Sequence, residues 1–495
     1  MTLRTVKQML GSAVEQYGDS PAIVTASSTE SFRQLGEAVA GAAESIRRRG
    51  VAPGDRVLIV APNSSALIHV WLGVICAGAI PAAVNPASTP SELEYFRDDL
   101  QPRLTLTAPE VRELDSSQNI PSPEAIRFPS PVYGEGSGRG PDPLEVAAIV
   151  YTSGTTSRPK GVMVRYAAYT ESGMSFPSWI GLRGRHRLWA CLPLFHINAQ
   201  AYSLMSSLAH GFSLAVSERF HASTFWRDAR DLQVTSVNVV GAMLDFLAKQ
   251  PESAWVESPL RTIYSAPGPD PKERTALESR FHVRIVTGYG MSENPFGCAE
   301  SATSRDKPGC VGRPRQPVSG FFENRLRVVR PDGSEAGEGE VGELRFQNPV
   351  MTPGYWNAPE ITAATLADGW LHTGDAGTRD GDGDVFISGR YKEMIRRRGE
   401  NIAPAEIEDV LRAHAAVETV AVIGIDAGLQ EEEVLAVVVL RQGASADEDA
   451  LKAFAAARLA AFKVPSRIAF RGSLPMTPTQ RVAKDILRRE YGRAG

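Results

Sequence analysis

The chain has 495 residues, of which 43% are apolar and 22% charged, and its formal net charge is −4. A chain of this length exceeds one ordinary domain and predicts about three structural units. The near balance of charge gives no reason to expect a nucleic-acid partner or an anionic membrane surface as a partner.

The first 100 residues alternate between helical and extended patterns. Residues 35–50 have helical spacing and end at a glycine, and residues 56–62 (RVLIVAP) have the composition of a buried strand. A helix over 64–78 and a strand over 79–85 are expected next. Alternation of this kind predicts parallel strands covered by helices, which is an α/β architecture.

Residues 67–84 carry no formal charge. This uncharged stretch of 18 residues is at the lower length limit for a membrane span. Gly78 and Pro81 within this stretch favour a helix followed by a buried strand instead. The N-terminus lacks the apolar segment of a signal peptide. The four cysteines are scattered without CxxC spacing, so we expect them to be reduced and the protein to be cytoplasmic.

The remaining chain changes character twice. Residues 116–143 are dense in Pro, Gly and Ser and predict a surface connection, after which a strand is expected over 144–154. Residues 309–390 are rich in Gly, Pro and short strand patterns and predict a small β-rich unit. From Tyr391 a compact α+β domain is expected, with helices over 404–415 and 448–462 and strands over 417–425, 433–440 and 466–470.

The motif YTSGTTSRPKG, residues 151–161, begins within the last four residues of the strand expected at 144–154 and continues beyond it as a loop. Its hydroxyl groups, its two glycines and Lys160 suit the β- and γ-phosphates of a nucleotide. A Walker A loop is excluded, because Pro159 precedes the lysine and Gly161 follows it.

This loop is one of six ordered motifs through which the chain resembles the AMP-forming acyl-CoA synthetase superfamily, which also includes luciferases and peptide-synthetase adenylation domains. The other five are PLFHINA (193–199), GYGMSE (288–293), GYWNAPEITAATLADGWLHTGD (354–375), ISGRYKEMIRRRGENIAPAEIE (387–408) and the closing TPTQRVAK. The variants RRRGENI and TPTQR are similar to the carnitine/crotonobetaine-CoA ligase-like branch.

The resemblance implies a large N-terminal domain over 1–389, a hinge at 390–392 and a mobile α+β C-terminal domain over 393–495. The N-terminal domain would contain two parallel-sheet α/β subdomains and the β-rich unit. The implied reaction has two steps: a carboxylate attacks the α-phosphate of MgATP to give acyl-AMP and pyrophosphate, and coenzyme A then displaces AMP. Positioning two anions together and neutralising the α-phosphate charge are the physical requirements of the first step.

Site residues follow from the resemblance, motif by motif. Lys160 and the loop before it would hold phosphates, Tyr289 would stack on adenine, Ser292 would contact the α-phosphate and Glu293 would hold Mg²⁺. Asp375 and Arg390 would bind the ribose, and His196 would lie beside the acyl pocket. Further expected nucleotide, hinge or thiol-tunnel residues are Thr152, Ser153, Gly154, Thr155, Thr156, Ala266, Pro267, Gly268, Gly288, Gly290, Met291, Lys392 and Gly399.

The cation that supports adenylation has three candidate assignments. Ungapped comparison with relatives ending in TGKIxK places Arg481 at the position of the lysine that bridges the carboxylate and the nucleotide. Arginine keeps the charge, but its planar fork differs from a compact ammonium. Lys484 could take the role instead, or Lys160 and Mg²⁺ could suffice without either residue.

The substrate acid is open. Small residues at candidate pocket positions, among them Ala199, Ser206, Gly268, Gly288 and Gly297, favour a bulky or polycyclic apolar acid. The alternatives to an acyl-CoA synthetase are an enzyme that passes its adenylate to a carrier protein or partner ligase, and a non-catalytic nucleotide-binding relative. A homodimer stays open as well.

Two further patterns are interpreted as turns. GEGEVG (337–342) fits GxGxxG, but its glutamates would repel a pyrophosphate and no helix is expected after it. DGDGD (380–384) begins like a calcium loop but has valine where that loop needs glycine.

Overall fold

The computed structural model describes residues 3–116, 142–152, 158–301, 303–397, 400–428, 431–476 and 482–492. The chain forms two compact units, which are Met1–Leu326 with Phe346–Leu371 and Arg327–Arg345 with His372–Gly495. The hinge at 390–392 stays a prediction, and most of the connection expected at 116–143 lies outside the described residues.

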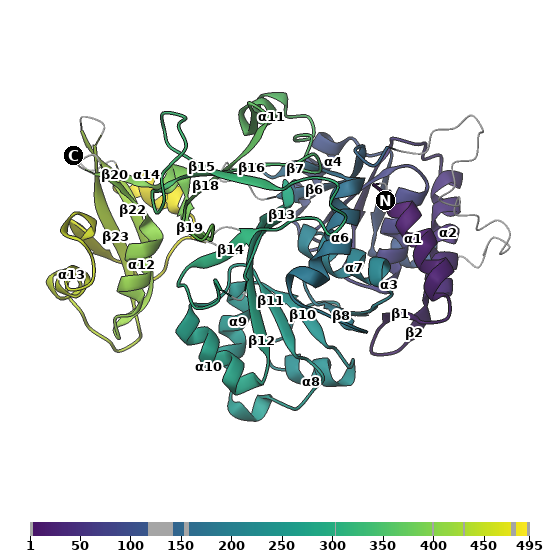
Figure 1. Ribbon diagram of the computed structural model, residues 1–495, viewed down its shortest axis with the longest axis horizontal. Coiled ribbons are helices and arrows are strands. Elements are labelled where there is room, and N and C mark those ends of the chain that lie inside the picture. The colour runs from purple at the N-terminus through teal and green to yellow at the C-terminus, as the bar shows by residue number, and fades with distance from the viewer. Residues whose placement is uncertain are drawn as a thin grey trace. The chain divides into compact units, whose positions relative to one another are not determined.

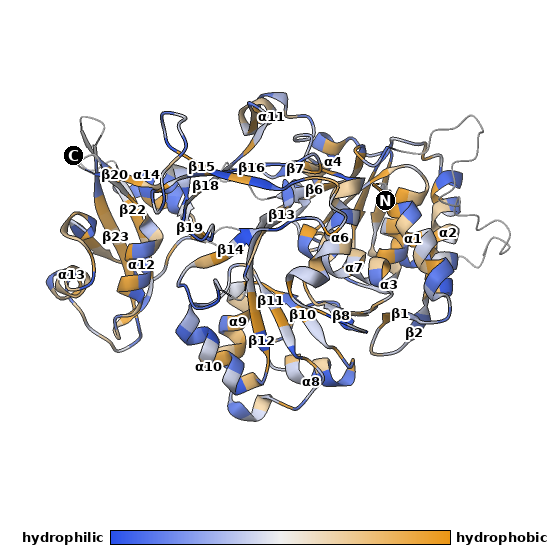
Figure 2. Ribbon diagram, in the orientation of Figure 1, coloured by the Kyte–Doolittle hydropathy of each residue, from blue (hydrophilic) through white to orange (hydrophobic). Residues whose placement is uncertain are grey.

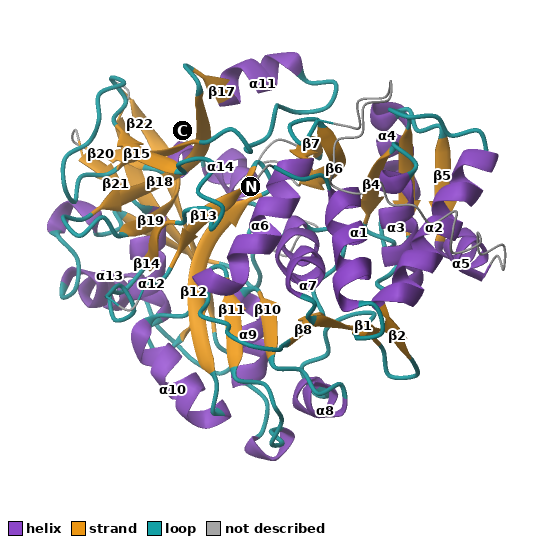
Figure 3. Ribbon diagram, turned by 45° about the vertical axis from the view of Figure 1, so that its right-hand side comes forward, coloured by secondary structure: helices purple, strands orange, loops and turns teal. Residues whose placement is uncertain are grey.

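The first unit contains a long sheet with the strand order β14-β13-β12-β11-β10-β8-β9-β1-β2. Pairing is parallel from β12 through β1, whereas β2, β13 and β14 are antiparallel to their neighbours. Figures 1 and 3 both show β10, β11 and β12 side by side. The bounds are β1 Pro21–Val24, β2 Thr29–Ser31, β8 Arg187–Ala190, β9 Ser213–Val216, β10 Ser236–Val239, β11 Thr262–Ser265, β12 Arg284–Met291, β13 Asn294–Ala299 and β14 Cys310–Pro314.

A second parallel sheet in this unit has the order β4-β3-β5, and β6 forms an antiparallel pair with β7. The bounds are β3 Arg56–Val60, β4 Ile80–Val84, β5 Leu104–Thr107, β6 Val146–Thr152 and β7 Lys160–Arg165. Two separate parallel sheets confirm the expected pair of α/β subdomains.

Helices cover these sheets, and local capping explains where several of them begin. Thr5, Ser31 and Thr89 each form a capping box at a helix start, and Asp270 caps the helix that follows it. The helices of this unit are α1 Val6–Tyr17, α2 Phe32–Arg48, α3 Ser65–Cys76, α4 Pro90–Leu100, α5 Ala108–Ser116, α6 Tyr166–Trp179, the π-helix η1 Asn198–Leu204, α7 Met205–His210, α8 Phe225–Asp231, α9 Gly241–Ala248, η2 Glu252–Ala254, α10 Pro271–Phe281 and α11 Pro359–Thr365.

The uncharged stretch 67–84 confirms the expected helix and strand. It forms most of α3 and all of β4, and nearly every residue of both is buried in the core. Gly73 lets α3 approach α2 closely, because an added Cβ would lie 2.8 Å from the Cβ of Ala42. No helix of the described residues is long and apolar enough to cross a membrane.

The second unit consists of strands and short helices around its own apolar core. Four strands follow the order β15-β16-β18-β19, a separate three-stranded sheet follows β22-β23-β24, and β20 pairs with β21. The mostly apolar residues of β23 are orange in Figure 2. The bounds are β15 Arg325–Val329, β16 Gly342–Gln347, β18 Trp370–Arg379, β19 Val385–Arg390, η3 Tyr391–Glu393, β20 Ile395–Arg397, β21 Glu400–Ile402, α12 Pro404–Arg412, β22 Val417–Gly428, β23 Glu431–Leu440, α13 Glu448–Ala456, η4 Ala461–Lys463, β24 Arg467–Phe470 and α14 Lys484–Tyr491. The first two residues of β18 belong to the first unit, where they pair with β17 Leu366–Ala367.

Candidate functional site

The expected phosphate loop connects two paired strands. Thr152 ends β6 and lies opposite Lys160, which begins β7. The Nζ of Lys160 lies 5.5 Å from the centre of the Tyr355 ring, which is within the range of a cation–π contact. Ser153, Gly154, Thr155 and Thr156 lie outside the described residues.

Glu293 lies close to the same tyrosine. The hydroxyl of Tyr355 donates to Oε1 of Glu293 at 2.7 Å, and the glutamate is only 7% exposed. The backbone N–H of Thr352 donates to the carbonyl oxygen of Glu293 at 2.7 Å. A lysine from β7, a carboxylate after β12 and a tyrosine after β16 therefore meet around one ring.

Backbone pairing explains why Tyr355 lies there. Its segment runs antiparallel to β7: Val162 bridges to Tyr355, the N–H of Met163 donates to Gly354 O at 3.1 Å, and the N–H of Trp356 donates to Gly161 O at 2.7 Å. The motifs assign no role to Tyr355, although it stands in GYWN. The only available signal was its place in that motif.

This carboxylate fits a magnesium ion of the expected kind. Mg²⁺ in nucleotide sites takes one or two protein carboxylates and fills its other positions with phosphate oxygens and water. Glu293 supplies a nearly buried carboxylate that Tyr355 orients, beside the strand that begins with Lys160.

The expected adenine wall is built from β12 and the loop after β11. Tyr289 is half-buried, and its ring stacks on Phe346 with centroids 6.2 Å apart and an interplanar angle of 22°. Gly290 is exposed, whereas Met291 and Ser292 are half-buried. In the preceding loop the peptide bond between Ala266 and Pro267 is cis.

The inference that small residues enlarge the acid pocket is wrong for three glycines. A Cβ added at Gly268 would lie 2.0 Å from Thr287 Oγ1, one at Gly288 would lie 2.4 Å from the Tyr264 hydroxyl, and one at Gly297 would lie 1.8 Å from the carbonyl oxygen of Tyr289. These glycines permit close packing of protein groups. They do not line empty space.

Ala199 and Ser206 are likewise fully buried. They belong to η1 and α7, so they help the helices to pack and give no support for a larger pocket. The expectation of a bulky acid therefore loses its structural basis.

The segment that carries His196 is held by polar side chains. Asn63 accepts from the N–H of Leu194 at 2.7 Å, and Gln200 donates to the carbonyl of Leu194 at 2.7 Å. His196 is exposed, although desolvation by neighbouring protein lowers the pKa of its imidazole to about 4. The imidazole is therefore mainly neutral at pH 7.

Asp375 and Arg390 meet within the second unit. They are paired residues of β18 and β19, and Arg390 Nη1 lies 3.1 Å from Asp375 Oδ1. The same Nη1 donates to the carbonyl of Thr373 at 3.2 Å. The expected ribose pair is thus formed by neighbouring strands.

Lys484 is held by two carboxylates of its own unit. Its Nζ lies 2.7 Å from Glu408 Oε1 and 3.4 Å from Glu393 Oε2, and its side chain is 14% exposed. Lys392 lies in η3, one residue before Glu393. Arg481 and Gly399 lie outside the described residues.

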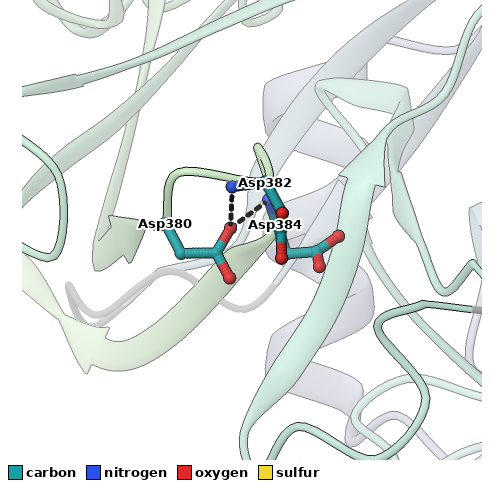
Figure 4. Close-up of side chains that lie close together, drawn as sticks. All are labelled: Asp380, Asp382 and Asp384. Atoms are coloured by element: carbon teal, nitrogen blue, oxygen red, sulfur yellow. Dashed lines mark hydrogen bonds between the residues drawn. The ribbon is translucent and has the colours of Figure 1, made fainter.

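The DGDGD segment forms the expected turn between β18 and β19. Asp380 Oδ1 accepts from the N–H groups of Asp382 and Asp384 at 3.0 and 2.9 Å (Figure 4). The three carboxylates come close together, but these hydrogen bonds describe a turn. In GEGEVG, the N–H of Glu340 donates to the carbonyl of Gly337 at 3.2 Å, so that segment is also a turn.

Comparisons with known proteins give matches over nearly the whole chain. The AMP-binding enzyme family matches residues 10–356, and the AMP-binding enzyme C-terminal domain matches residues 406–481. The chain is 32% identical to sulfoacetate–CoA ligase of Cupriavidus necator over 499 residues, covering 97% of this chain and 96% of the relative.

It is also 29% identical to crotonobetaine/carnitine–CoA ligase of Salmonella paratyphi A over 517 residues, covering 98% of this chain and 99% of the relative. Among solved structures, ATP-bound MatB from Rhodopseudomonas palustris superposes with a TM-score of 0.84 at 24% identity, covering 98% and 99% of the two chains. That likeness confirms the fold.

Proposed function

The chain belongs to the AMP-binding enzyme family and is an ATP-dependent acid–CoA ligase, and from that premise we propose how its residues divide the two steps. In the first step an oxygen of the substrate carboxylate bonds to the α-phosphorus of ATP, and the bond from that phosphorus to pyrophosphate breaks. In the second step the CoA sulfur bonds to the acyl carbon, and AMP leaves.

The meeting of Lys160, Tyr355 and Glu293 carries this proposal. Lys160 neutralises phosphate charge, with the hydroxyl-bearing loop from Thr152 to Thr156 as its partner. Glu293 holds Mg²⁺, which when bound supplies positive charge to the phosphate oxygens. Tyr355 fixes the orientation of the Glu293 carboxylate. Preorganised charge of this kind acts mainly on the developing negative charge of the transition state.

The remaining roles concern binding. Tyr289 with the loop Ala266–Gly268 lines adenine, Ser292 contacts the α-phosphate, and Asp375 with Arg390 binds the ribose. We place His196 beside the acyl group, Lys392 at the hinge and Gly399 in the thiol tunnel, as the family resemblance implies.

We assign the adenylation cation to Arg481 and not to Lys484. Lys484 is already paired with Glu408 and Glu393, so moving it to the nucleotide would leave two carboxylates without that cation. Removing one partner of such a mostly buried pair costs about 3–5 kcal/mol.

The acid is to be found experimentally. Relatives are named for sulfoacetate and for crotonobetaine or carnitine, which are compact acids with a second charged group, and others for ferulate. A small acid with a second charge is therefore our first candidate, and the bulky apolar acid is kept as a hypothesis for comparison. The reaction is proposed for the cytoplasm, because all four cysteines are free and buried.

The test is ATP–pyrophosphate exchange over these acids, with and without CoA, for the wild type and Glu293→Ala. Exposed Glu257→Gln is the control for surface charge. We expect acid-dependent exchange, a thioester with CoA, and loss of both only in Glu293→Ala. Exchange without thioester would favour transfer to a carrier protein or partner ligase, and unchanged exchange in Glu293→Ala would overturn the assigned role.

A further inference from the structure

Glu300 is a buried carboxylate that has no role in the two steps above. It contacts β12, the strand that carries Tyr289. Glu300 directly follows β13 and is only 4% exposed. Its Oε2 accepts from Arg274 Nη1 at 2.9 Å, and its Oε1 accepts from Arg305 Nη1 at 3.0 Å. A charge is kept at such depth only where pairing and hydrogen bonds offset its desolvation.

The same carboxylate holds the backbone of Thr287. Its Oε2 also accepts from the N–H of Thr287 at 3.0 Å, while the N–H of Glu300 donates to Thr287 O at 2.8 Å. Thr287 is the residue at which β12 changes its neighbour: it is the last to pair with β11, and Gly288 is the first to pair with β13. Glu300 therefore fixes the point where β12 leaves the parallel sheet and becomes the segment GYGMSE.

Thr287 in turn contacts the other nucleotide element. Its Oγ1 occupies the space beside Gly268, where a Cβ would lie 2.0 Å away, and Ser265 is its partner on β11. Arg274 lies on α10, which begins directly after this loop. One carboxylate thus connects the strand of Tyr289, the loop of Gly268 and the helix that follows the loop.

We propose that Glu300 is a positioning residue that sets the distance between the two sides of the adenine site, the loop Ser265–Pro269 and the residues Gly288–Tyr289. The inference rests on the proposed function, because it takes these elements as the nucleotide site. It predicts a defect that is selective for the adenine end of ATP.

The experiment compares Glu300→Gln with Glu278→Gln. Glu278 belongs to the same charge cluster, since it pairs with Arg305 and accepts from the N–H of Ile285 at 2.6 Å. Both variants remove one negative charge beside Arg305, but only Glu300 holds Thr287. The readouts are KM for ATP and for the acid, the ratio of kcat/KM for ATP over GTP, ATP affinity by calorimetry, and Tm.

For Glu300→Gln we expect KM for ATP to rise about tenfold and the preference for ATP over GTP to fall by a similar factor, since misplacement of site elements is costly. The acid KM should change less than about twofold in both variants, because Glu300 and Glu278 lie outside the segment of His196, which we place beside the acyl group. Glu278→Gln should keep the ATP preference even where its Tm falls equally. Equal nucleotide defects in the two variants, or a wild-type ATP preference in Glu300→Gln, would overturn the inference.

A second variant tests the inference if Glu300→Gln does not fold. Gly268→Ala presses on Thr287 without removing a charge, and we expect the same loss of ATP preference. Unchanged ATP affinity there would also count against the inference. Absence of pyrophosphate exchange in the wild type would instead defeat the proposed function, while ATP affinity by calorimetry would still decide the role of Glu300.

Discussion

The Tyr355 hydroxyl donates to Glu293 Oε1 at 2.7 Å, and the ring of the same tyrosine lies 5.5 Å from Lys160 Nζ. One side chain therefore contacts both charged groups to which we assign the phosphates and magnesium. Its position depends on the antiparallel pairing of its segment with β7, so the three residues are fixed by backbone hydrogen bonds.

Tyr355→Phe should weaken adenylation while leaving the fold intact. The variant removes one hydrogen bond to a charged group, which is worth roughly 1.5–3 kcal/mol. If that bond orients the carboxylate for Mg²⁺, exchange should fall about tenfold or more, and higher Mg²⁺ should restore part of the rate. Exchange measured against Mg²⁺ concentration, with Tm as the folding control, checks this. A lower Tm with an unchanged Mg²⁺ dependence would contradict it.

Asp375→Asn tests the ribose assignment through the nucleotide itself. A carboxylate that accepts from ribose hydroxyls discriminates against 2′-deoxy-ATP by about tenfold, because the lost bond is charge-assisted. We expect the wild type to show this discrimination in KM and Asp375→Asn to lose most of it. Asp382→Asn, an exposed carboxylate of the same unit, is the control. Equal discrimination in all three proteins would remove Asp375 from the ribose site.

The order of elements could be predicted well, because hydrophobic periodicity and turn residues are local. The expected strand 79–85 is β4 at Ile80–Val84, and the expected helix 404–415 is α12 at Pro404–Arg412. The helix expected over 448–462 is shorter, since α13 ends at Ala456 before the short helix η4. Element type follows from local pattern, whereas helix ends depend on packing that the sequence does not display.

The site could be predicted only in part. Lys160 and Glu293 carry charges in recognisable motifs, but Tyr355 has a role only because its segment pairs with a strand almost 200 residues earlier in the chain. The expectation that Gly268 and Gly288 line a cavity is wrong, because a small residue that lines a cavity and one that admits a neighbouring side chain look alike in sequence. Glu300 could not be found at all, since its partners are distributed over α10, β12 and the chain after β13.

His69 predicts a pH dependence of stability. Its imidazole is 3% exposed, with Nδ1 2.5 Å from Asp115 Oδ1 and Nε2 2.8 Å from Glu30 Oε1. Burial alone would lower its pKa, but the hydrogen bonds to Asp115 and Glu30 outweigh burial and raise the pKa from 6.5 to about 9.

A raised pKa in the folded protein stabilises it below the unfolded value, and that stabilisation is lost as pH rises through the folded value. The contribution should therefore be complete below pH 6.5 and disappear near pH 9, and it should be on the order of 3 kcal/mol. Urea unfolding at several pH values between 6 and 9.5 should show this loss in the wild type. His69→Gln should lack it, and parallel pH profiles for the two proteins would contradict the prediction.

Variants of Arg481 and Lys484 should show that Arg481 is a catalytic cation and Lys484 a structural one. Arg481→Ala should reduce ATP–pyrophosphate exchange about 10²–10³-fold, the usual cost of removing one electrostatic contact to the transition state, with little change in Tm. Lys484→Met should lower Tm, because Glu408 and Glu393 lose their shared cation.

The exchange rate of folded Lys484→Met, measured well below its Tm, should stay within about tenfold of the wild type, since a loosened second unit loses only part of its positioning effect. A double variant, Lys484→Met with Glu408→Gln, should recover part of the lost Tm. Glutamine at 408 removes one of the two carboxylate charges that the loss of Lys484 would leave without a cation. The opposite pattern, a lost exchange in Lys484→Met at unchanged Tm and normal exchange in Arg481→Ala, would assign the adenylation cation to Lys484. In that case the ion pair with Glu408 must break during the first step, and the rate should rise when Glu408→Gln releases the lysine.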